Sequence, residues 1–347
     1  MSKLENAPQA FTFDDFIIAP KYSTIRSRKN PDVSVSLPGL SLKTAIIAAP
    51  MNTITEESMI LAMAAEGATS VLHRFMDLET QVAISKRIIS QGISNFWVAI
   101  GATKDYIERV IELKKAGVNN FCIDVANGHS EICIEATKAI MHKISNVQIF
   151  AGNVCTADGA LRLAEAGASV IRVGIGPGSM CTTRLITGHG IPQLTAIEDC
   201  AKIKTLFPNV AIVADGGLRN SGDLVKAFAI GADAVMIGSL LKATKETPGK
   251  VIEEDGVSYK NYSGMASEEG RSNWFDGKET KFVPEGVSTK VIYEGKTVND
   301  VMRKLIGGLK TGMSFSDASN IKELQQKAEW RRITNAGYTE GTPHGKR

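Results

Sequence analysis

The feature that most constrains the fold of this chain is a repeated alternation of short apolar runs with longer amphipathic segments. The apolar runs are rich in residues that favour strands buried on both faces, and the amphipathic segments are typical of helices that cover such strands. The runs are Thr44–Ala49, Thr69–Leu72, Phe96–Gly101, Asn119–Asp124, Val147–Gly152, Ser169–Gly174, Val210–Asp215 and Ala234–Gly238. Eight is the number of parallel strands that closes a cylinder. The alternation therefore predicts an α/β protein with a (β/α)8 TIM barrel, and an open doubly wound sheet is the alternative.

The amphipathic segments carry their own end signals. Tyr106–Ala116, Ala157–Ala166 and Gly222–Ile230 have the spacing of surface helices. Residues 165–168 and 229–232 repeat a pattern in which a glycine ends a helix just before the next strand begins.

The segment after the last predicted strand has a different composition. Residues 250–290 are polar and glycine-rich, and they are too many for a simple connector. We expect a mobile flap at residues 266–290. From Val298 to Arg332 the pattern is helical again and predicts packing on the barrel, and residues 334–347 form a C-terminal tail.

Bulk composition limits the class of protein. The 347 residues are 43% apolar and 22% charged, which is ordinary for a globular chain that buries a large core. A single barrel domain spanning residues 1–347 accounts for this length without an inserted second domain. The net charge of +3, with no dense basic stretch, argues against a nucleic-acid partner. No run of about 18 apolar residues occurs, so we expect no membrane partner.

The cysteines indicate a reducing compartment. The chain has five, an odd number, and no two are spaced as Cys-x-x-Cys, so neither a disulfide framework nor a zinc site is favoured. The N-terminal segment has no apolar signal region. We therefore expect a cytoplasmic protein with free thiols. Cys122 and Cys155 lie in or beside predicted strands and are interpreted as core thiols.

The sharpest chemical signal is the loop GIGPGSMCTTR at residues 174–184. Its glycines and proline shape a tight turn whose backbone N–H groups can face an anion. The loop presents Cys181 among polar neighbours, and a thiol displayed in this way is typical of a nucleophile. A glycine-rich turn with an incidental cysteine is the alternative for the motif in isolation.

Other polar residues follow the strands, where barrels carry their chemistry. Residues 215–217 and 238–239 end the last two strands, and backbone amides in such loops often bind phosphate. Asp215 could accept hydrogen bonds from ribose hydroxyls, and Asp124 is placed to hold a cofactor hydroxyl or amide. For His129 a local role at a helix start is favoured over catalysis.

Taken together, these segments resemble the IMP dehydrogenase/GMP reductase family over nearly the whole chain. The motifs that carry the resemblance are FTFDDFIIAPKYST, AAPMNTITE, IDVANGHSE, AGNVCT, VGIGPGSMCTTR, ADGGLRNSGD, VMIGSLL, YSGMAS and NAGYTEGTPH. The resemblance implies an oxidoreductase in which Cys181 attacks C2 of a purine nucleoside monophosphate and forms a covalent intermediate.

The resemblance also assigns substrate-binding residues. The positions that hold the phosphate match Ser179, Gly217, Gly238, Ser239 and Tyr262. The ribose-binding aspartate matches Asp215, and the segment against the base matches Gly264, Met265 and Ala266.

For the remaining chemistry the resemblance implies a nicotinamide cofactor, a monovalent cation and a homotetramer. Positions near the nicotinamide match Asp124, Gly174 and Gly176. A proton-transfer pair matches Thr183 and Glu285, which act with Cys181 as the catalytic residues. In the family, backbone carbonyls of the cysteine loop bind the cation, in particular K+, and the matching residues here are Gly176, Gly178 and Cys181. The resemblance implies that residues 340–342 of a neighbouring subunit complete that site.

Three features favour GMP reductase, which uses NADPH to convert GMP to IMP and ammonia. Residues 269–281 of the flap contain no Arg-Tyr dipeptide, which dehydrogenases use to activate water, and the flap is short. The motifs IDVANGHSE and AGNVCT match reductases closely. The paired CBS regulatory domains common in dehydrogenases are absent, because nothing interrupts the barrel between Gly101 and Gly117.

Other features favour the alternative, an IMP dehydrogenase without CBS domains that converts IMP, NAD and water to XMP and NADH. ADGGLRNSGD, VMIGSLL, FVPEG and the terminal EGTPH match dehydrogenases better. Phe282 stands where reductases place an arginine, and Asn52 replaces a usual aspartate. A third hypothesis, from a different class, is an inactive barrel that binds nucleotides as a sensor. The intact Cys181, Thr183 and Glu285 argue against it.

Overall fold

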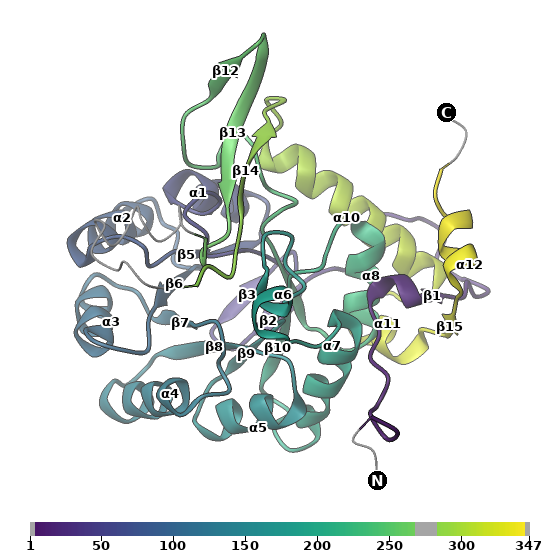
Figure 1. The fold of residues 1–347 in the computed structure, drawn as a ribbon, viewed down its shortest axis with the longest axis horizontal. Coiled ribbons are helices and arrows are strands. Elements are labelled where there is room, and N and C mark those ends of the chain that lie inside the picture. Colours follow the sequence, from purple (N-terminus) through teal and green to yellow (C-terminus); the bar gives the residue numbers. More distant parts are fainter. Residues whose placement is uncertain (1–3, 268–282, 344–347) are drawn as a thin grey trace.

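The computed structural model describes residues 4–267 and 283–343, in which eight parallel strands form a closed barrel (Figure 1). The strands are β4 (Ile46–Ala48), β5 (Thr69–Leu72), β6 (Trp97–Ile100), β7 (Asn120–Asp124), β8 (Gln148–Val154), β9 (Val170–Val173), β10 (Ala211–Asp215) and β11 (Ala234–Ile237). Their order around the cylinder follows the chain, and β11 pairs with β4 to close it. The predicted barrel is confirmed, and each predicted run overlaps one of its strands.

Helices follow the strands and cover the outside of the barrel (Figure 1). They are α1 (Glu57–Ala65), α2 (Leu78–Ser90), α3 (Tyr106–Lys115), α4 (Glu131–Lys143), α5 (Ala157–Glu165), α7 (Gln193–Ala201), α8 (Ser221–Ala229) and α10 (Val298–Phe315). Side chains cap several of their first turns; the Asp77 carboxylate, for example, accepts the Thr80 N–H at 2.6 Å at the start of α2. Gly167 and Gly231, at φ +102° and +132°, end α5 and α8 as predicted. None of the helices within the described residues is long and apolar enough to span a bilayer.

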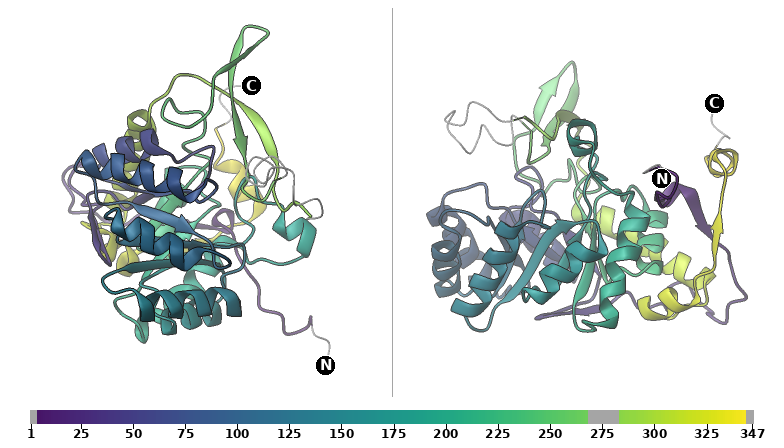
Figure 2. Two further views of the ribbon diagram at one scale, coloured as in Figure 1. Left: turned by 90° about the vertical axis from the view of Figure 1, so that its left-hand side faces the viewer. Right: turned by 60° about the horizontal axis from the view of Figure 1, so that its bottom comes forward.

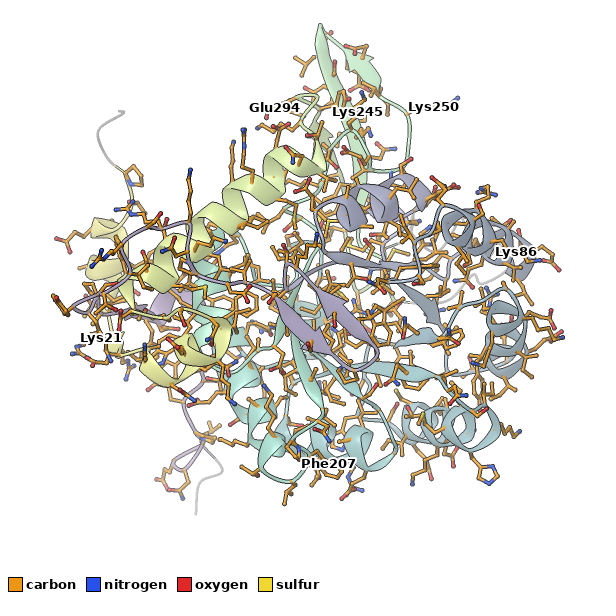
Figure 3. The ribbon with its side chains drawn as sticks, turned by 180° about the vertical axis from the view of Figure 1, so that it is seen from behind. Lys21, Lys86, Phe207, Lys245, Lys250 and Glu294 are labelled. Atoms are coloured by element: carbon orange, nitrogen blue, oxygen red, sulfur yellow. The ribbon has the colours of Figure 1, made fainter. Side chains whose placement is uncertain are left out.

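A short hairpin covers the end of the barrel at which the strands begin. It consists of β2 (Val35–Leu37) and β3 (Leu40–Leu42), and it lies across the middle of the view from behind in Figure 3. Gly39 in its turn is so close to the start of β8 that an added Cβ would lie 2.7 Å from Cγ of Gln148. The opposite end, where the strands finish, is left for the functional loops.

The region after β11 contains a sheet that the sequence analysis did not predict. Strands β12 (Ile252–Glu254), β13 (Val257–Ser263) and β14 (Ser288–Ile292) pair antiparallel and project from the barrel (Figures 1 and 2). Most of their side chains are exposed or half-buried, so the residues are polar and give little hydrophobic alternation. The predicted flap falls mainly on residues 268–282, which lie outside the described residues, and its mobility stays a prediction.

The prediction of helix from Val298 to Arg332 is wrong at its C-terminal end. Helices α10 and α11 (Ile321–Lys327) are present, but β15 (Trp330–Arg332) pairs antiparallel with β1 (Phe16–Ile18). Trp330 also packs edge-on against Phe16, with ring centroids 6.1 Å apart. A pairing between the two ends of the chain leaves no local periodic signal. The remaining elements are η1 (Phe13–Asp15), α6 (Thr183–Thr187), η2 (Lys202–Thr205) and, within the predicted tail, α12 (Asn335–Glu340).

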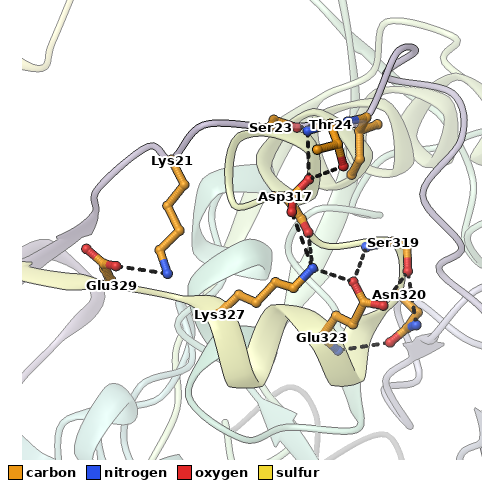
Figure 4. Close-up of polar contacts among 10 residues, drawn as sticks. Lys21, Ser23, Thr24, Asp317, Ser319, Asn320, Glu323, Lys327 and Glu329 are labelled. Atoms are coloured by element: carbon orange, nitrogen blue, oxygen red, sulfur yellow. Dashed lines mark hydrogen bonds and ion pairs between the residues drawn. The ribbon is translucent and has the colours of Figure 1, made fainter.

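A charged network fastens the N-terminal segment to the turn between α10 and α11 (Figure 4). Thr24 donates to the Asp317 carboxylate from its backbone N and its Oγ1, at 2.8 and 2.9 Å. The ammonium of Lys327 donates to the Glu323 carboxylate at 2.9 Å. Lys327 also donates to the Asp317 carboxylate at 3.5 Å, so the network joins two parts of the chain that are distant in sequence, Thr24 and residues 317–327.

We expect this network to make the stability of the protein sensitive to acid. The Ser319 backbone N–H and then Lys327 lower the pKa of Glu323 from 4.5 to about 2. A carboxyl whose pKa is lower in the folded state contributes stability that is full above the unfolded pKa and is lost as pH falls through the folded one. The difference in free energy of unfolding between wild type and Glu323→Gln should therefore shrink as pH falls from 4.5 towards about 2. Denaturant titrations at several acidic pH values measure it, and a constant difference would contradict the expectation.

Candidate active site

A cavity of about 800 Å³ opens at the carboxyl ends of the barrel strands. Every site residue that the sequence analysis assigned within a single subunit lines this cavity, whereas residues 340–342, expected to act from a neighbouring subunit, do not. The assigned residues that line it are Asp124, Gly174, Gly176, Gly178, Ser179, Cys181, Thr183, Asp215, Gly217, Gly238, Ser239, Tyr262, Gly264, Met265, Ala266 and Glu285. Residues from widely separated parts of the chain therefore face one space, as expected for the loop end of a barrel.

The loop from Gly174 to Arg184 is held close to the neighbouring strand end. Gly174 has φ +149°, and an added Cβ would lie 2.0 Å from the carbonyl oxygen of Asp215, so only glycine fits there. Further along, the Cys181 N–H donates to the Gly178 carbonyl at 3.0 Å and closes a turn. This turn presents the cysteine side chain to the cavity.

The thiol of Cys181 is the first member of a hydrogen-bonded chain that ends at a carboxylate. Its Sγ donates to Thr183 Oγ1 at 3.1 Å, and Thr183 Oγ1 donates to Glu285 Oε2 at 2.9 Å. The backbone fixes this arrangement, because the Thr182 N–H donates to the Glu285 carbonyl at 2.9 Å. Cys181 and Gly286 also form an antiparallel bridge. These two hydrogen bonds give a proton a continuous path between the Cys181 sulfur and the Glu285 carboxylate.

The other cysteines have different surroundings. Cys122, Cys133 and Cys200 are buried, and burial raises the pKa of each thiol, that of Cys133 to about 12. Cys155 is half-buried, and burial raises its pKa too. None of these four lines the cavity, so Cys181 is the thiol placed to act as a nucleophile.

Hydroxyl groups and glycines gather at the side of the cavity next to β11 and β13. The hydroxyls of Ser179 and Tyr262 lie 3.3 Å apart. Burial raises the pKa of Tyr262, so its phenol stays neutral and can donate a hydrogen bond. Two glycines, Gly217 (φ +76°) and Gly238, line the same cavity, and a Cβ at Gly238 would lie 3.0 Å from Sδ of Met51 and 3.8 Å from the Tyr262 hydroxyl. Hydroxyl groups and the backbone N–H groups of glycines are the donors with which proteins commonly bind a phosphate.

An ion-pair cluster that the sequence analysis missed joins two predicted site residues. Arg172, with 8% of its surface exposed, donates from Nε to Asp215 Oδ2 at 2.8 Å and from Nη1 to Asp124 Oδ1 at 2.5 Å. Burial alone would lower the pKa of Arg172, but Asp215 and Asp124 raise it above its usual range. Asn153 Nδ2 donates to the same oxygen of Asp215 at 2.8 Å. An arginine inside the apolar run Val170–Val173 was the signal that could have revealed this cluster.

Gln193 is a second residue that sequence reasoning missed. It begins α7 and is buried, and its Nε2 donates to the carbonyls of Val173 at 2.8 Å and Asp215 at 3.1 Å. It therefore fixes the ends of β9 and β10 relative to each other. His129, by contrast, lies 3.2 Å from Asp158 and does not line the cavity, in agreement with a local role.

The carboxylates and thiols do not form a metal centre in the part of the chain that the structure describes, where no group of three or more His, Cys, Asp or Glu side chains could hold an ion. The cation expected from the sequence would instead be held by backbone carbonyls, which are hard oxygen ligands. The carbonyl of Gly178 already accepts the Cys181 N–H, so it would offer a cation its second lone pair.

Comparisons with known proteins agree with this geometry. The IMP dehydrogenase / GMP reductase domain matches residues 10–344. The chain belongs to the IMP dehydrogenase/GMP reductase family. It is 46% identical over 252 residues to inosine-5'-monophosphate dehydrogenase from Aquifex aeolicus. The aligned region covers 71% of this chain and 51% of that enzyme. The chain thus spans about half the length of that relative. A Borreliella burgdorferi enzyme of the same name is 34% identical, with 97% of each protein covered.

A solved structure resembles the whole chain. It is a cysteine-to-alanine variant of GMP reductase from Trypanosoma brucei in complex with guanosine 5'-monophosphate, with a TM-score of 0.93, 28% identity and full coverage of both chains. The family therefore makes this protein an oxidoreductase, while its relatives carry the names of two different reactions.

Proposed function

We propose that this protein is a GMP reductase, which uses NADPH to convert GMP to IMP and ammonia. The hydrogen bonds from Cys181 through Thr183 to Glu285 carry the covalent part of this proposal, because they supply a nucleophile and a proton path in one place. The absence of an Arg-Tyr dipeptide from residues 269–281 supports the reductase, because this reaction needs no residue that activates water.

In the proposed reaction the Cys181 sulfur forms a bond to C2 of the purine. The proton of the thiol passes through Thr183 and Glu285 to the amino group, which leaves C2 as ammonia. A reduced nicotinamide held beside Asp124 would supply the hydride that C2 needs, and Cys181 would then leave as a thiolate while IMP is released. This thiolate takes up a proton before the next turnover, which balances the reaction.

The nucleotide binds, in this proposal, along the side of the cavity next to β11 and β13. Ser179, Gly217, Gly238, Ser239 and Tyr262 hold the phosphate. Asp215 accepts hydrogen bonds from the ribose, and Gly264, Met265 and Ala266 lie against the base.

The nicotinamide fits the part of the cavity beside Asp124. Gly174 and Gly176 line this part of the cavity, which continues past Asp124 to Arg74 and Thr103 and so leaves room for a second, elongated ligand. A monovalent cation at the carbonyls of the cysteine loop, a homotetramer and a cytoplasmic location complete the proposal.

The second candidate function is IMP dehydrogenase, with NAD as the cofactor. It is favoured by the relatives at 46% and 34% identity, which are named for that reaction. The same thiol and the same carboxylate could serve it, since both reactions begin with attack of sulfur on C2.

One assay separates the candidates. The purified protein is mixed with GMP and NADPH, and separately with IMP and NAD, and the absorbance of the reduced nicotinamide is followed. Loss of absorbance in the first mixture alone supports the reductase, and a gain in the second alone supports the dehydrogenase. No change in either mixture, together with tight GMP binding, supports an inactive nucleotide sensor.

We expect Glu285→Gln to slow turnover by about 10²–10⁴-fold, because the chain from Cys181 then ends at an amide that cannot accept the proton. Release of ammonia should become rate-limiting, so rapid-quench experiments should show less of the ammonia-free covalent intermediate than in the wild type, because that species forms only after this step. The control is Thr289→Val, which removes an exposed hydroxyl on β14, four residues after Glu285 in the chain. Turnover of Glu285→Gln at the wild-type rate would mean that the proton follows another path.

A further inference from the structure

Lys260 is a buried lysine that the proposed reaction does not use. It lies on β13 and is 4% exposed. Its ammonium donates to the carbonyls of Thr247 at 2.8 Å, Thr244 at 3.0 Å and Lys245 at 3.3 Å, and to Thr247 Oγ1 at 3.1 Å. A cluster of backbone carbonyls around one positive charge is the arrangement by which proteins bind a cation. In this cluster the positive charge is the ammonium of Lys260 itself.

The carbonyls that surround Lys260 end a series of turns that begins at the cavity. The Leu241 N–H donates to the carbonyl of Gly238 at 2.9 Å, and the Thr244 N–H donates to that of Leu241 at 3.2 Å. The Thr247 N–H then donates to the Thr244 carbonyl at 3.3 Å. The segment from Gly238 to Thr247 is thus one continuous structure. Its first residues line the cavity, and its last carbonyls contact the ammonium.

A buried ammonium is a costly way to fill this space. Burial lowers the pKa of Lys260, and the nearby Glu246 offsets only part of that effect. The Glu246 carboxylate itself accepts the backbone N–H of Val298 at 3.0 Å. An apolar side chain of similar length would avoid the loss of hydration, but it could not hold three carbonyls together. The charge therefore specifies the shape of this segment.

The same strand connects Lys260 to the proposed phosphate site. Residues two apart on a strand point to the same face, so Lys260 and Tyr262 share the inner face of β13. The Tyr262 hydroxyl is 3.3 Å from that of Ser179. Lys242, within the turns, lies 5.9 Å from the Tyr262 ring. Figure 3 shows Lys245, one of the residues whose carbonyl contacts the ammonium, beside the projecting sheet.

We propose that Lys260 is a positioning residue that fixes two parts of the phosphate site relative to each other, the turn at Gly238 and Ser239 and the hydroxyl of Tyr262. This inference rests on the proposed function, because it takes the ligand of these residues to be the phosphate of a purine nucleotide. Lys260 does not touch the ligand; it acts through the segments that do.

The test compares the binding of IMP and inosine, which differ only in the phosphate. IMP takes part in both candidate reactions, so the choice between them does not affect the experiment. Calorimetric titration is carried out on the wild type, Lys260→Met, Lys260→Arg and the control Lys290→Met, which removes an exposed lysine from the neighbouring β14. We expect Lys260→Met to weaken IMP binding about tenfold, equivalent to about 1.4 kcal/mol, and to change inosine binding less than twofold. Lys260→Arg should bind IMP more tightly than Lys260→Met, and Lys290→Met should match the wild type.

The outcomes are distinct. Unchanged IMP binding in Lys260→Met, or an equal loss for IMP and inosine, overturns the positioning role and leaves the proposed function intact. A wild type that binds no IMP overturns both. If Lys260→Met does not fold, Thr247→Val removes one oxygen from the cluster, and a smaller loss confined to IMP then supports the proposal, whereas no loss contradicts it.

Discussion

The variant Cys181→Ala is expected to lose at least about 10⁴-fold in turnover, as is typical when the nucleophile of a covalent mechanism is removed. Alanine cannot form the bond to C2 of the purine, and no other cysteine within the described residues lines the cavity. Affinity for GMP should change little, because the groups proposed to hold phosphate and ribose do not depend on the sulfur. Steady-state kinetics measures the first effect, and calorimetric titration with GMP measures the second.

Cys155→Ala is the matched control for this variant. Cys155 is also half-buried, but burial raises its pKa and it lies outside the cavity, so its removal should leave turnover within about twofold of the wild type. Mass spectrometry of the wild type quenched during turnover should show the nucleotide attached to the peptide that contains Cys181. Substantial turnover by Cys181→Ala would remove covalent catalysis from the proposed function.

The barrel and its loops could be predicted because their signals are local. Each barrel strand lies in a largely apolar run, and the glycines after α5 and α8 adopt the positive φ angles that their pattern predicts. Asp124 and Asp215 end their strands and Cys181 lies in the loop after β9, and parallel strands bring such ends to one edge. Sequence order alone therefore sufficed to place these residues around one cavity.

The features that could not be predicted depend on contacts between distant segments. Strand β15 forms because Trp330 and its neighbours meet β1 from the other end of the chain. The projecting sheet is largely exposed, so it lacks the alternation that would reveal it. Arg172 looks like one polar residue in an apolar run until the barrel brings Asp124 and Asp215 to it from two other strands.

Arg172→Met is expected to lower the free energy of unfolding by about 3 kcal/mol or more, the usual consequence of removing one partner from a buried ion pair. The side chains of Asp124 and Asp215 are each 16% exposed, so the variant leaves two poorly hydrated carboxylates without their shared guanidinium. Denaturant titration measures the change. Arg162→Met is the control, because Arg162 pairs with Asp158 on the exposed face of α5 and its loss should cost little.

A second substitution shows whether the lost stability comes from uncompensated charge. In Arg172→Met with Asp124→Asn, one of the two carboxylates is neutral, so the double variant should regain part of the stability that Arg172→Met loses. If the effects of the two substitutions simply add, Arg172 contributes packing and not charge compensation. Lysine should replace Arg172 poorly, because one ammonium cannot donate with the fork geometry that reaches both carboxylates.

The same cluster predicts how the kinetics respond. One guanidinium holds the carboxylate proposed to bind ribose and the carboxylate proposed to lie near the nicotinamide. Its removal should therefore raise KM for the nucleotide and for the cofactor together, whereas Asp124→Asn should raise KM mainly for the cofactor. Initial rates over a grid of both substrates measure the two constants. A rise in only one of them in Arg172→Met would show that the halves of the cavity are held independently, and the argument that Arg172 couples them would fail.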